Sequence, residues 1–189
     1  GIAGRSSAWQ SVGRTQIIER LASAARGRVL EAALTALGVT NLPPFPIAYH
    51  GVPPGPELFF NGTRMTLARW PNEGAWELID GFPEAHAQND GHGGKIGKLE
   101  DGFRYRGDRP RQWKDTSDVW VHGYWSWDWA NSYEQVAAID LDQRLITARP
   151  PYGLYGFRKG QRFQFLNVLE ELDQPGEWSG DLGAFDGIV

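Results

Sequence analysis

The chain has 189 residues, a formal net charge of −4 and a pI near 5.6, and its basic residues are scattered apart from the stretch Arg104–Arg111. This length suits one domain with a sizeable core, and the lack of a basic block argues against nucleic acid as a partner. The sequence contains no cysteine, which excludes disulfides and thiolate metal sites. No apolar stretch approaches the roughly 20 residues that span a bilayer, so we expect no membrane partner.

The composition predicts a fold built from short strands. The chain contains 24 glycines and 12 prolines, which supply many turns, and 13% of its residues are aromatic. We therefore expect a mainly β protein, a β-sandwich or barrel-like domain with a short N-terminal helix. The expected organisation is a flexible arm over residues 1–14, a single β-rich domain over residues 15–178 and a C-terminal tail over residues 179–189.

The N-terminal part of the domain carries the helical pattern. Ile17, Ile18 and Leu21 recur at helical spacing, with Thr15 suited to the N-cap and Gly27 to the end of the helix. Residues 28–38 fit a helix or a strand equally well. Residues 41–56 contain six prolines, which exclude both a helix and an interior strand.

Two hairpins are predicted in the β-rich part. Residues 57–60 and 63–70 flank the pair Asn61-Gly62, which is typical of a type I′ turn. Residues 139–148 predict a second tight hairpin that turns at Asp142-Gln143. The Gly-rich residues 81–101 indicate a long, mobile surface loop. The remaining strands are expected at about 102–106, 118–129, 134–140, 143–149 and 161–168.

The segment Asp118–Ala130 holds four of the nine tryptophans. Because alternate side chains of a strand share a face, an extended segment would place Trp125, Trp127 and Trp129 in one row. Such a row has two interpretations. The indoles stack on sugar rings, or they fill the core of a sheet, which is the commoner role of buried aromatic residues.

Four longer motifs carry a resemblance to a known family. They are LFFNGTRMTLARWPNEGAW at 58–76, GFRYRGDRPRQW at 102–113, VWVHGYWSWDWANSYEQVAAID at 119–140 and RFQFLNVLEELDQPGEW at 162–178. Together they resemble the non-helical β domain near the N-terminus of large bacterial right-handed parallel β-helix proteins. Those proteins are similar to carbohydrate-active enzymes, including glycoside hydrolases and polysaccharide lyases. The resemblance covers roughly residues 17–178.

The resemblance implies a bacterial, exported, carbohydrate-linked protein, whose partner is an oligosaccharide or polysaccharide. The β-helix that carries the catalytic groove in that family does not follow in this sequence, so we expect a fragment of a larger enzyme or a separate accessory domain. Three functions stay open: a glycoside hydrolase, a non-catalytic carbohydrate-binding or accessory β domain, and a structural remnant. The surface that would pack on a β-helix also predicts self-association.

Hydrolysis of a glycoside uses two carboxyl groups, which lie about 5–5.5 Å apart for retention and about 6.5–9.5 Å apart for inversion. Asp128 lies between two tryptophans, an apolar setting that favours the protonated form of a general acid. Glu171 and Asp173 would share a face in an extended chain. We therefore expect Asp128, Glu171 and Asp173 to be catalytic. The alternative is that these carboxylates pair with arginines or cap turns, and residues 173–176 are themselves a turn signature.

Further carboxylates near aromatic residues are Glu134, Glu170 and Glu177. The residues expected to contact the sugar are Arg69, Trp70, His122, Tyr124, Trp125, Trp127 and Trp129. In this hypothesis one face of the strand fills the core, and the other carries His122, Tyr124 and Asp128 toward a groove. Arg109 and Arg111 would bind the carboxylates of uronic acids or, alternatively, hold local aspartates.

His86, His92 and His122, together with Asp90, are residue types that bind zinc. Their spacing matches no known ligand pattern, so we expect neither a metal nor a cofactor, and His122 is expected to be a hydrogen-bonded structural residue. The sequence contains no G-x-S-x-G element, which argues against a serine hydrolase.

Overall fold

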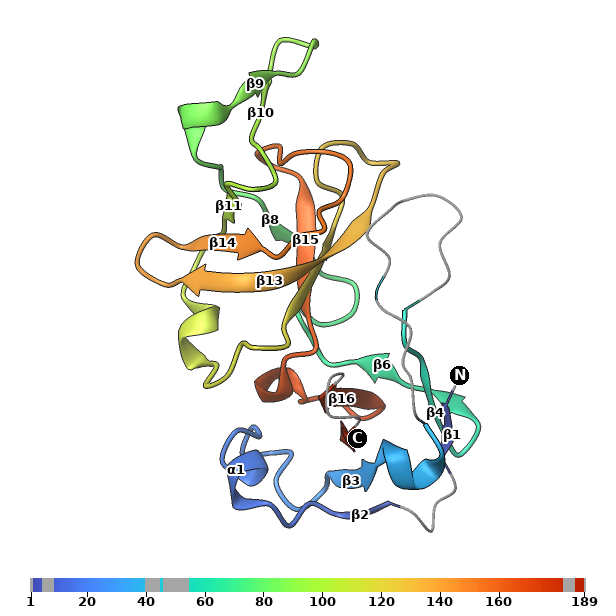
Figure 1. Cartoon of the computed structure of the whole chain (residues 1–189). Helices are drawn as coiled ribbons and strands as arrows, with labels where there is room; N and C mark the ends of the chain where they lie inside the picture. The colour runs from blue at the N-terminus through green and yellow to red at the C-terminus, as the bar shows by residue number, and fades with distance from the viewer. Residues whose placement is uncertain (1, 5–8, 40–44, 46–54, 182–185, 189) are drawn as a thin grey trace. The chain divides into compact units, whose positions relative to one another are not determined.

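The computed structural model describes residues 2–4, 9–39, 45, 55–181 and 186–188 (Figure 1). The chain forms two compact units. The first comprises Gly1–Phe45, Pro54–Arg69 and Asn167–Val189, and the second comprises Pro46–Pro53 and Trp70–Leu166. The structure is mainly β, with one short α-helix in the described part and no described sheet that closes into a barrel, so the predicted fold class is confirmed. The prediction for residues 41–56 lies almost wholly outside the described residues.

The single α-helix, α1 (Thr15–Ile18), is shorter than the sequence pattern indicates. Its N-cap is Arg14 rather than Thr15, and no side chain caps the first turn. Without a capping side chain, little offsets the free-energy cost of forming the first helical turn. The helix therefore ends at Ile18, and most residues between Ile18 and Gly27 form turns. The helical spacing still marks burial correctly, because Ile17 and Leu21 belong to a core cluster with Val29.

The first unit contains a five-stranded sheet in the order β2-β3-β17-β16-β6. Its strands are β2 (Gln10–Ser11), β3 (Leu30–Ala33), β17 (Asp186–Ile188), β16 (Glu177–Asp181) and β6 (Thr66–Leu67). Residues 28–38, which fit either a helix or a strand, form both, since the 3-10 helix η2 (Leu34–Leu37) follows β3 directly. Another 3-10 helix, η5 (Leu169–Glu171), precedes β16.

A separate three-stranded sheet contains β1 (Ile2–Gly4), β4 (Leu58–Phe60) and β5 (Thr63–Arg64). Asn61 and Gly62 have φ values of 49° and 79° between β4 and β5, and Phe60 pairs with Thr63, which confirms the predicted type I′ turn. The second arm, predicted over residues 63–70, is wrong from Thr66 onward, because Thr66–Leu67 pairs with β16 instead of β4. Strands β1, β2 and β17 lie in segments that the sequence pattern left as an arm and a tail. The predicted domain limits at residues 15 and 178 stay a prediction.

The second unit contains a sheet in the order β11-β14-β13-β12-β15-β7, with β8 also paired to β15. The bounds are β7 (Arg69–Trp70), β8 (Glu77–Leu78), β11 (Phe103–Arg104), β12 (Trp120–Gly123), β13 (Ser132–Asp140), β14 (Leu145–Ala148) and β15 (Arg162–Leu166). Asp140 pairs with Leu145 across residues 141–144, and its carboxylate accepts hydrogen bonds from the N–H groups of Asp142 and Gln143. The second predicted hairpin is therefore confirmed, with a four-residue loop.

Residues 81–101 contain more regular structure than a surface loop. They form the 3-10 helix η3 (Glu84–His86) and a hairpin of β9 (Gln88–Asn89) and β10 (Lys95–Ile96), and a further 3-10 helix, η4 (Arg109–Gln112), follows. The carboxylate of Asp90 organises the hairpin, because it accepts the N–H groups of His92 and Gly94 and pairs with Arg158. Gly-rich composition alone gave no sign of this buried carboxylate.

The predicted strand over residues 118–129 ends at Gly123, so the prediction of a tryptophan row is wrong. A side chain at Gly123 would collide with the indole of Trp125, since an added Cβ would lie 2.4 Å from Trp125 Cζ3. Beyond Gly123 the segment is not a strand, and Trp125 is 2% exposed, whereas Trp129 is 59% exposed. Trp125 packs on Phe103 and Phe157 in the core, as the alternative interpretation expected for an indole of this segment.

Candidate functional site

In strands β12 and β13 one face of the sheet is half-exposed, whereas the other is buried. In β12 the buried residues Val121 and Gly123 alternate with the half-buried Trp120 and His122. His122 is paired with Tyr133 of β13 on one side and with Gln164 of β15 on the other. The three side chains therefore form a row across the sheet, in which the rings of His122 and Tyr133 stack 4.4 Å apart.

Two further aromatic residues extend this row. The indole of Trp76 lies 5.8 Å from the ring of His122 and 5.8 Å from the ring of Tyr124, measured between centroids. Trp76 is 37% exposed, so part of its indole is open to solvent. We call the set Trp76, His122, Tyr124 and Tyr133 the aromatic face.

Arg162 joins the aromatic face to a carboxylate. Its guanidinium lies 3.9 Å from the ring of Tyr124 and 5.7 Å from that of Trp76, so cation–π attraction holds it in place. Its Nη1 also donates to Asp128 Oδ1 over 2.6 Å. The Asp128 side chain is 74% exposed, and exposed ion pairs of this kind contribute little stability. A ligand can therefore displace Asp128 from Arg162 at small cost.

His122 has a hydrogen-bond partner at each of its two ring nitrogens. Its Nε2 lies 3.0 Å from Asn131 Oδ1, which accepts, and its Nδ1 lies 3.3 Å from Gln164 Nε2, which donates. His122 is thus a hydrogen-bonded residue of the sheet, as expected from the sequence. His86 instead contacts Asp101 over 2.9 Å, and His92 lies against Trp127.

Within the described ranges, no group of three or more His, Asp or Glu side chains is arranged to hold a metal ion. Nor does any helix among the described residues have the length and apolar character to cross a membrane.

The three expected catalytic residues are distributed over both units. Asp128 belongs to the second unit, and Glu171 and Asp173 belong to the first. Asp128 does not have the apolar setting that its neighbours in sequence indicate, because it is exposed and paired with Arg162. Glu171 is 1% exposed and ends the 3-10 helix η5. The expectation that Glu171 and Asp173 share a strand face is therefore wrong, since this segment is not extended.

Glu134 and Glu177 are buried carboxyl groups whose pKa values are raised, and sequence reasoning named them only as neighbours of aromatic residues. Burial raises the pKa of Glu134 to about 7, although its Oε1 accepts hydrogen bonds from Gly153 N and Ser132 Oγ. Its Oε2 has no hydrogen-bond partner within the part of the chain that the structure describes. The alternation of β13 was the available signal, because it places Glu134 on the same face as the buried Ser132 and Val136.

The second buried carboxyl group is Glu177 at the start of β16. Burial raises its pKa to about 7; two backbone N–H groups lower the pKa, the charge of Asp173 raises it, and Arg69 lowers it. Glu177 Oε2 accepts the N–H groups of Asp173 and Gln174, each over 3.0 Å, so it also closes the predicted turn at residues 173–176.

The remaining expected contact residues lie apart from the aromatic face. The guanidinium of Arg109 lies over the ring of Trp70, 4.3 Å from its centroid, and that of Arg158 lies over the ring of Trp127, 4.9 Å from its centroid. Arg69 is half-buried in the first unit. Trp129 packs edge-on against Tyr155. Arg111 pairs with Asp108 and Asp142, in agreement with the alternative for this arginine, whereas both alternatives for Arg109 stay predictions.

A solved glycoside hydrolase shares this fold. Its structure matches with a TM-score of 0.55 and 16% sequence identity, over 86% of this chain and 26% of that chain. The chain therefore spans about a quarter of the length of that protein. No protein-family model matches the sequence, and no curated protein matches it. At this identity the similarity concerns the fold alone, and it agrees in part with the expected resemblance to a domain of carbohydrate-active proteins.

Proposed function

We propose that this chain is a carbohydrate-binding β domain of a carbohydrate-active protein, and that the aromatic face is its binding surface. The observation that carries the proposal is the cluster of Trp76, Tyr124 and Arg162 on the half-exposed face of the sheet. The fold shared with part of a glycoside hydrolase supports the choice of a carbohydrate as the ligand class.

The chemistry of this surface suits a sugar. The apolar face of a pyranose packs on an indole, and Trp76 offers one that is 37% exposed. Sugar hydroxyls both donate and accept hydrogen bonds, and Arg162 and Asp128 supply donors and acceptors beside the rings. Because Arg162 is held by Tyr124, little side-chain entropy is lost when a ligand binds to it.

Replacing Trp76 by alanine is expected to weaken oligosaccharide binding at least about tenfold, since the stacking surface is lost. The measurement is isothermal titration calorimetry with a panel of oligosaccharides of differing sugar and linkage. Leu78→Ala is a matched control, because Leu78 is 43% exposed and lies on β8 near Trp76 in sequence but has no ring to offer. Equal affinity of the Trp76→Ala variant and the wild type for every bound glycan would exclude the aromatic face.

The second candidate function is hydrolysis of glycosidic bonds by paired carboxyl groups. One observation favours it: Asp173 and Glu177 are neighbours in one turn, and the pKa of Glu177 is about 7. A carboxylic acid that stays protonated near neutral pH beside a second, charged carboxylate is the arrangement that a glycosidase uses. In this proposal Glu171 and Asp173 keep their predicted roles in the first unit, and Glu177 is added as the general acid. Asp128, predicted as a general acid from its place between two tryptophans, belongs to the second unit and is tested as a separate candidate.

If the chain hydrolyses glycosides, amide substitution of the catalytic carboxylates is expected to lower kcat by about 10² to 10⁴. The variants are Asp128→Asn, Glu171→Gln, Asp173→Asn and Glu177→Gln, assayed with aryl glycosides at pH 5 to 8. Glu100→Gln, at an exposed position away from this turn, is the matched control. A wild-type protein that binds glycans but releases no aglycone would favour the binding domain over the hydrolase.

A further inference from the structure

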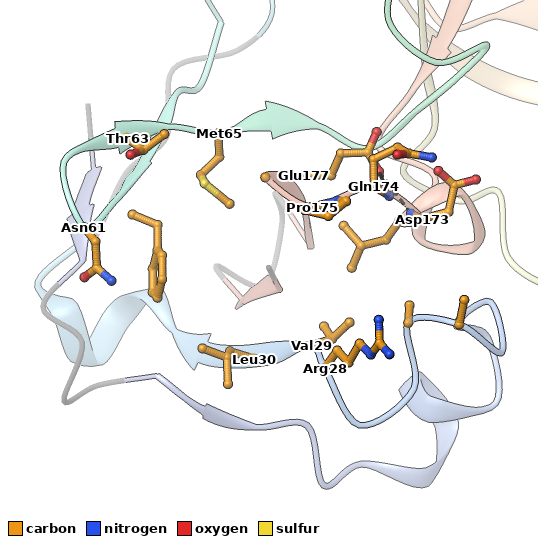
Figure 2. Close-up of a pocket in the computed structure, with 15 residues that line it drawn as sticks. Arg28, Val29, Leu30, Asn61, Thr63, Met65, Asp173, Gln174, Pro175 and Glu177 are labelled. Carbon is orange, nitrogen blue, oxygen red and sulfur yellow. Dashed lines mark hydrogen bonds between the residues drawn. The ribbon is translucent and has the colours of Figure 1, made fainter.

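The first unit contains a pocket of about 580 Å³ (Figure 2). This volume lies within the range of small-molecule sites, roughly 300–1,000 Å³. Three segments far apart in sequence form it: residues 24–30, the β4–β5 hairpin and the turn that leads into β16. Its walls are mostly apolar, with side chains from Ala24, Ala25, Leu30, Phe60, Met65 and Leu172.

The apolar walls belong to well-packed parts of the unit. Leu30, Phe60 and Met65 pack against the buried cluster around Trp9 and Trp178. Leu172 belongs to the cluster of Leu21 and Val29 on the other side. Because these lining residues pack against the hydrophobic core, their positions are fixed, which favours a preformed binding site over a shallow surface depression.

Polar groups also line this pocket. Arg28, Asn61, Thr63, Asp173, Gln174 and Glu177 are among its lining residues. Glu177 is only 6% exposed, and its Oε2 is occupied by the N–H groups of Asp173 and Gln174. No hydrogen bond to its other oxygen, Oε1, occurs among the described residues, so a buried carboxyl group retains bonding capacity at the pocket (Figure 2).

We propose that this pocket binds a small uncharged amphiphile, an alkyl or aryl glycoside, with its apolar chain or ring against the walls and its hydroxylated head at the polar residues. The balance of charge argues for an uncharged head, because Arg28 and Asp173 both line the pocket, so attraction of an ionic head to one is offset by repulsion from the other while the ion still loses its hydration. Hydroxyls suit the neighbouring amides and the carboxyl group, since they both donate and accept. The raised pKa of Glu177 supports this choice, because its neutral form donates a hydrogen bond to a hydroxyl.

The proposal does not rest on the aromatic face, which lies in the other unit, nor on catalysis. The test is isothermal titration calorimetry of the full chain with n-octyl β-D-thioglucoside, which resists hydrolysis, below its micelle-forming concentration. Saturable binding with a 1:1 stoichiometry is expected. Ala24→Trp places an indole at the pocket and is expected to weaken binding at least about tenfold. Ala36→Trp is the matched control, at an exposed position of η2 outside the lining, and should bind like the wild type.

Two charged analogues test the uncharged head. Octanoate and octylammonium carry the same chain, and each is expected to bind at least about tenfold more weakly than the thioglucoside. Equal or tighter binding of either ion would overturn the proposal, as would undiminished thioglucoside binding to Ala24→Trp or an absence of binding to the wild type. Trp76→Ala should leave this binding unchanged, so failure here and failure of the aromatic face are distinguishable.

Discussion

Replacement of Trp125 by alanine is expected to lower the free energy of unfolding by about 4 kcal/mol, within the range observed for buried aromatic-to-alanine changes. Trp125 is 2% exposed and packs on Phe103 and Phe157, and its Nε1 donates to Ser132 Oγ over 2.8 Å. The substitution therefore opens a cavity and leaves a buried hydroxyl with one bond fewer. Urea denaturation followed by circular dichroism measures the loss.

Trp129→Ala is the matched control from the same segment. Trp129 is 59% exposed, so its replacement is expected to change the free energy of unfolding by no more than about 0.5 kcal/mol. Similar losses of unfolding free energy for Trp125→Ala and Trp129→Ala would contradict the observed burial of Trp125 and exposure of Trp129.

The second large effect concerns pH. Glu134→Gln is expected to stabilise the protein relative to the wild type by about 3 kcal/mol more at pH 8 than at pH 4, because the pKa of Glu134 rises from 4.5 to about 7 on folding. Below pH 4.5 the carboxyl group is protonated in both the folded and the unfolded chain, so it has no effect on the pH dependence. As the pH rises from 4.5 to 7, the unfolded chain loses this proton first, and the stability of the wild type falls.

Glutamine is a suitable replacement because its Oε1 can accept the same hydrogen bonds from Ser132 and Gly153 without a charge. The measurement is a series of urea denaturations of both proteins across pH 4 to 8. The difference between variant and wild type isolates Glu134 from Glu177, whose pKa is also about 7. Glu100→Gln, at an exposed position, should give a difference that stays within about 0.5 kcal/mol at every pH. A difference in unfolding free energy between Glu134→Gln and the wild type that does not change with pH would show that folding does not raise the pKa of Glu134.

Local patterns predicted the fold wherever the backbone itself determines the geometry. Asn61-Gly62 favours positive φ at two successive residues, and Asp140 caps its own turn, so both hairpins followed from a few residues. The helix at Thr15–Ile18 was predicted in place but not in length, because apolar spacing reports burial and not the missing cap. The end of β12 at Gly123 was missed, because Trp125 is buried against Phe103 and Phe157, which lie far away in sequence and enter no local pattern.

The candidate site was predictable only in part, for the same reason. The alternation of β12 placed His122 opposite the core, and the structure brings His122 and Tyr124 together on that face. The partners that complete it come from distant strands: Trp76 precedes β8, and Arg162 belongs to β15. Glu171 and Asp173 would share a face only in an extended chain, whereas Glu171 ends the 3-10 helix η5 and Asp173 begins the predicted turn.

The order of the strands along the chain has a consequence for synthesis on the ribosome. The second unit's sheet uses strands within residues 69–166, which are contiguous in sequence, whereas the first unit's larger sheet pairs β3 with β17 and β6 with β16. A nascent chain that has reached residue 170 already contains every described strand of the second sheet but lacks β16 and β17. Domains generally fold as units during translation. The second unit can therefore complete its sheet before the first unit, whose strand β3 pairs with β17 only after that strand has been synthesised.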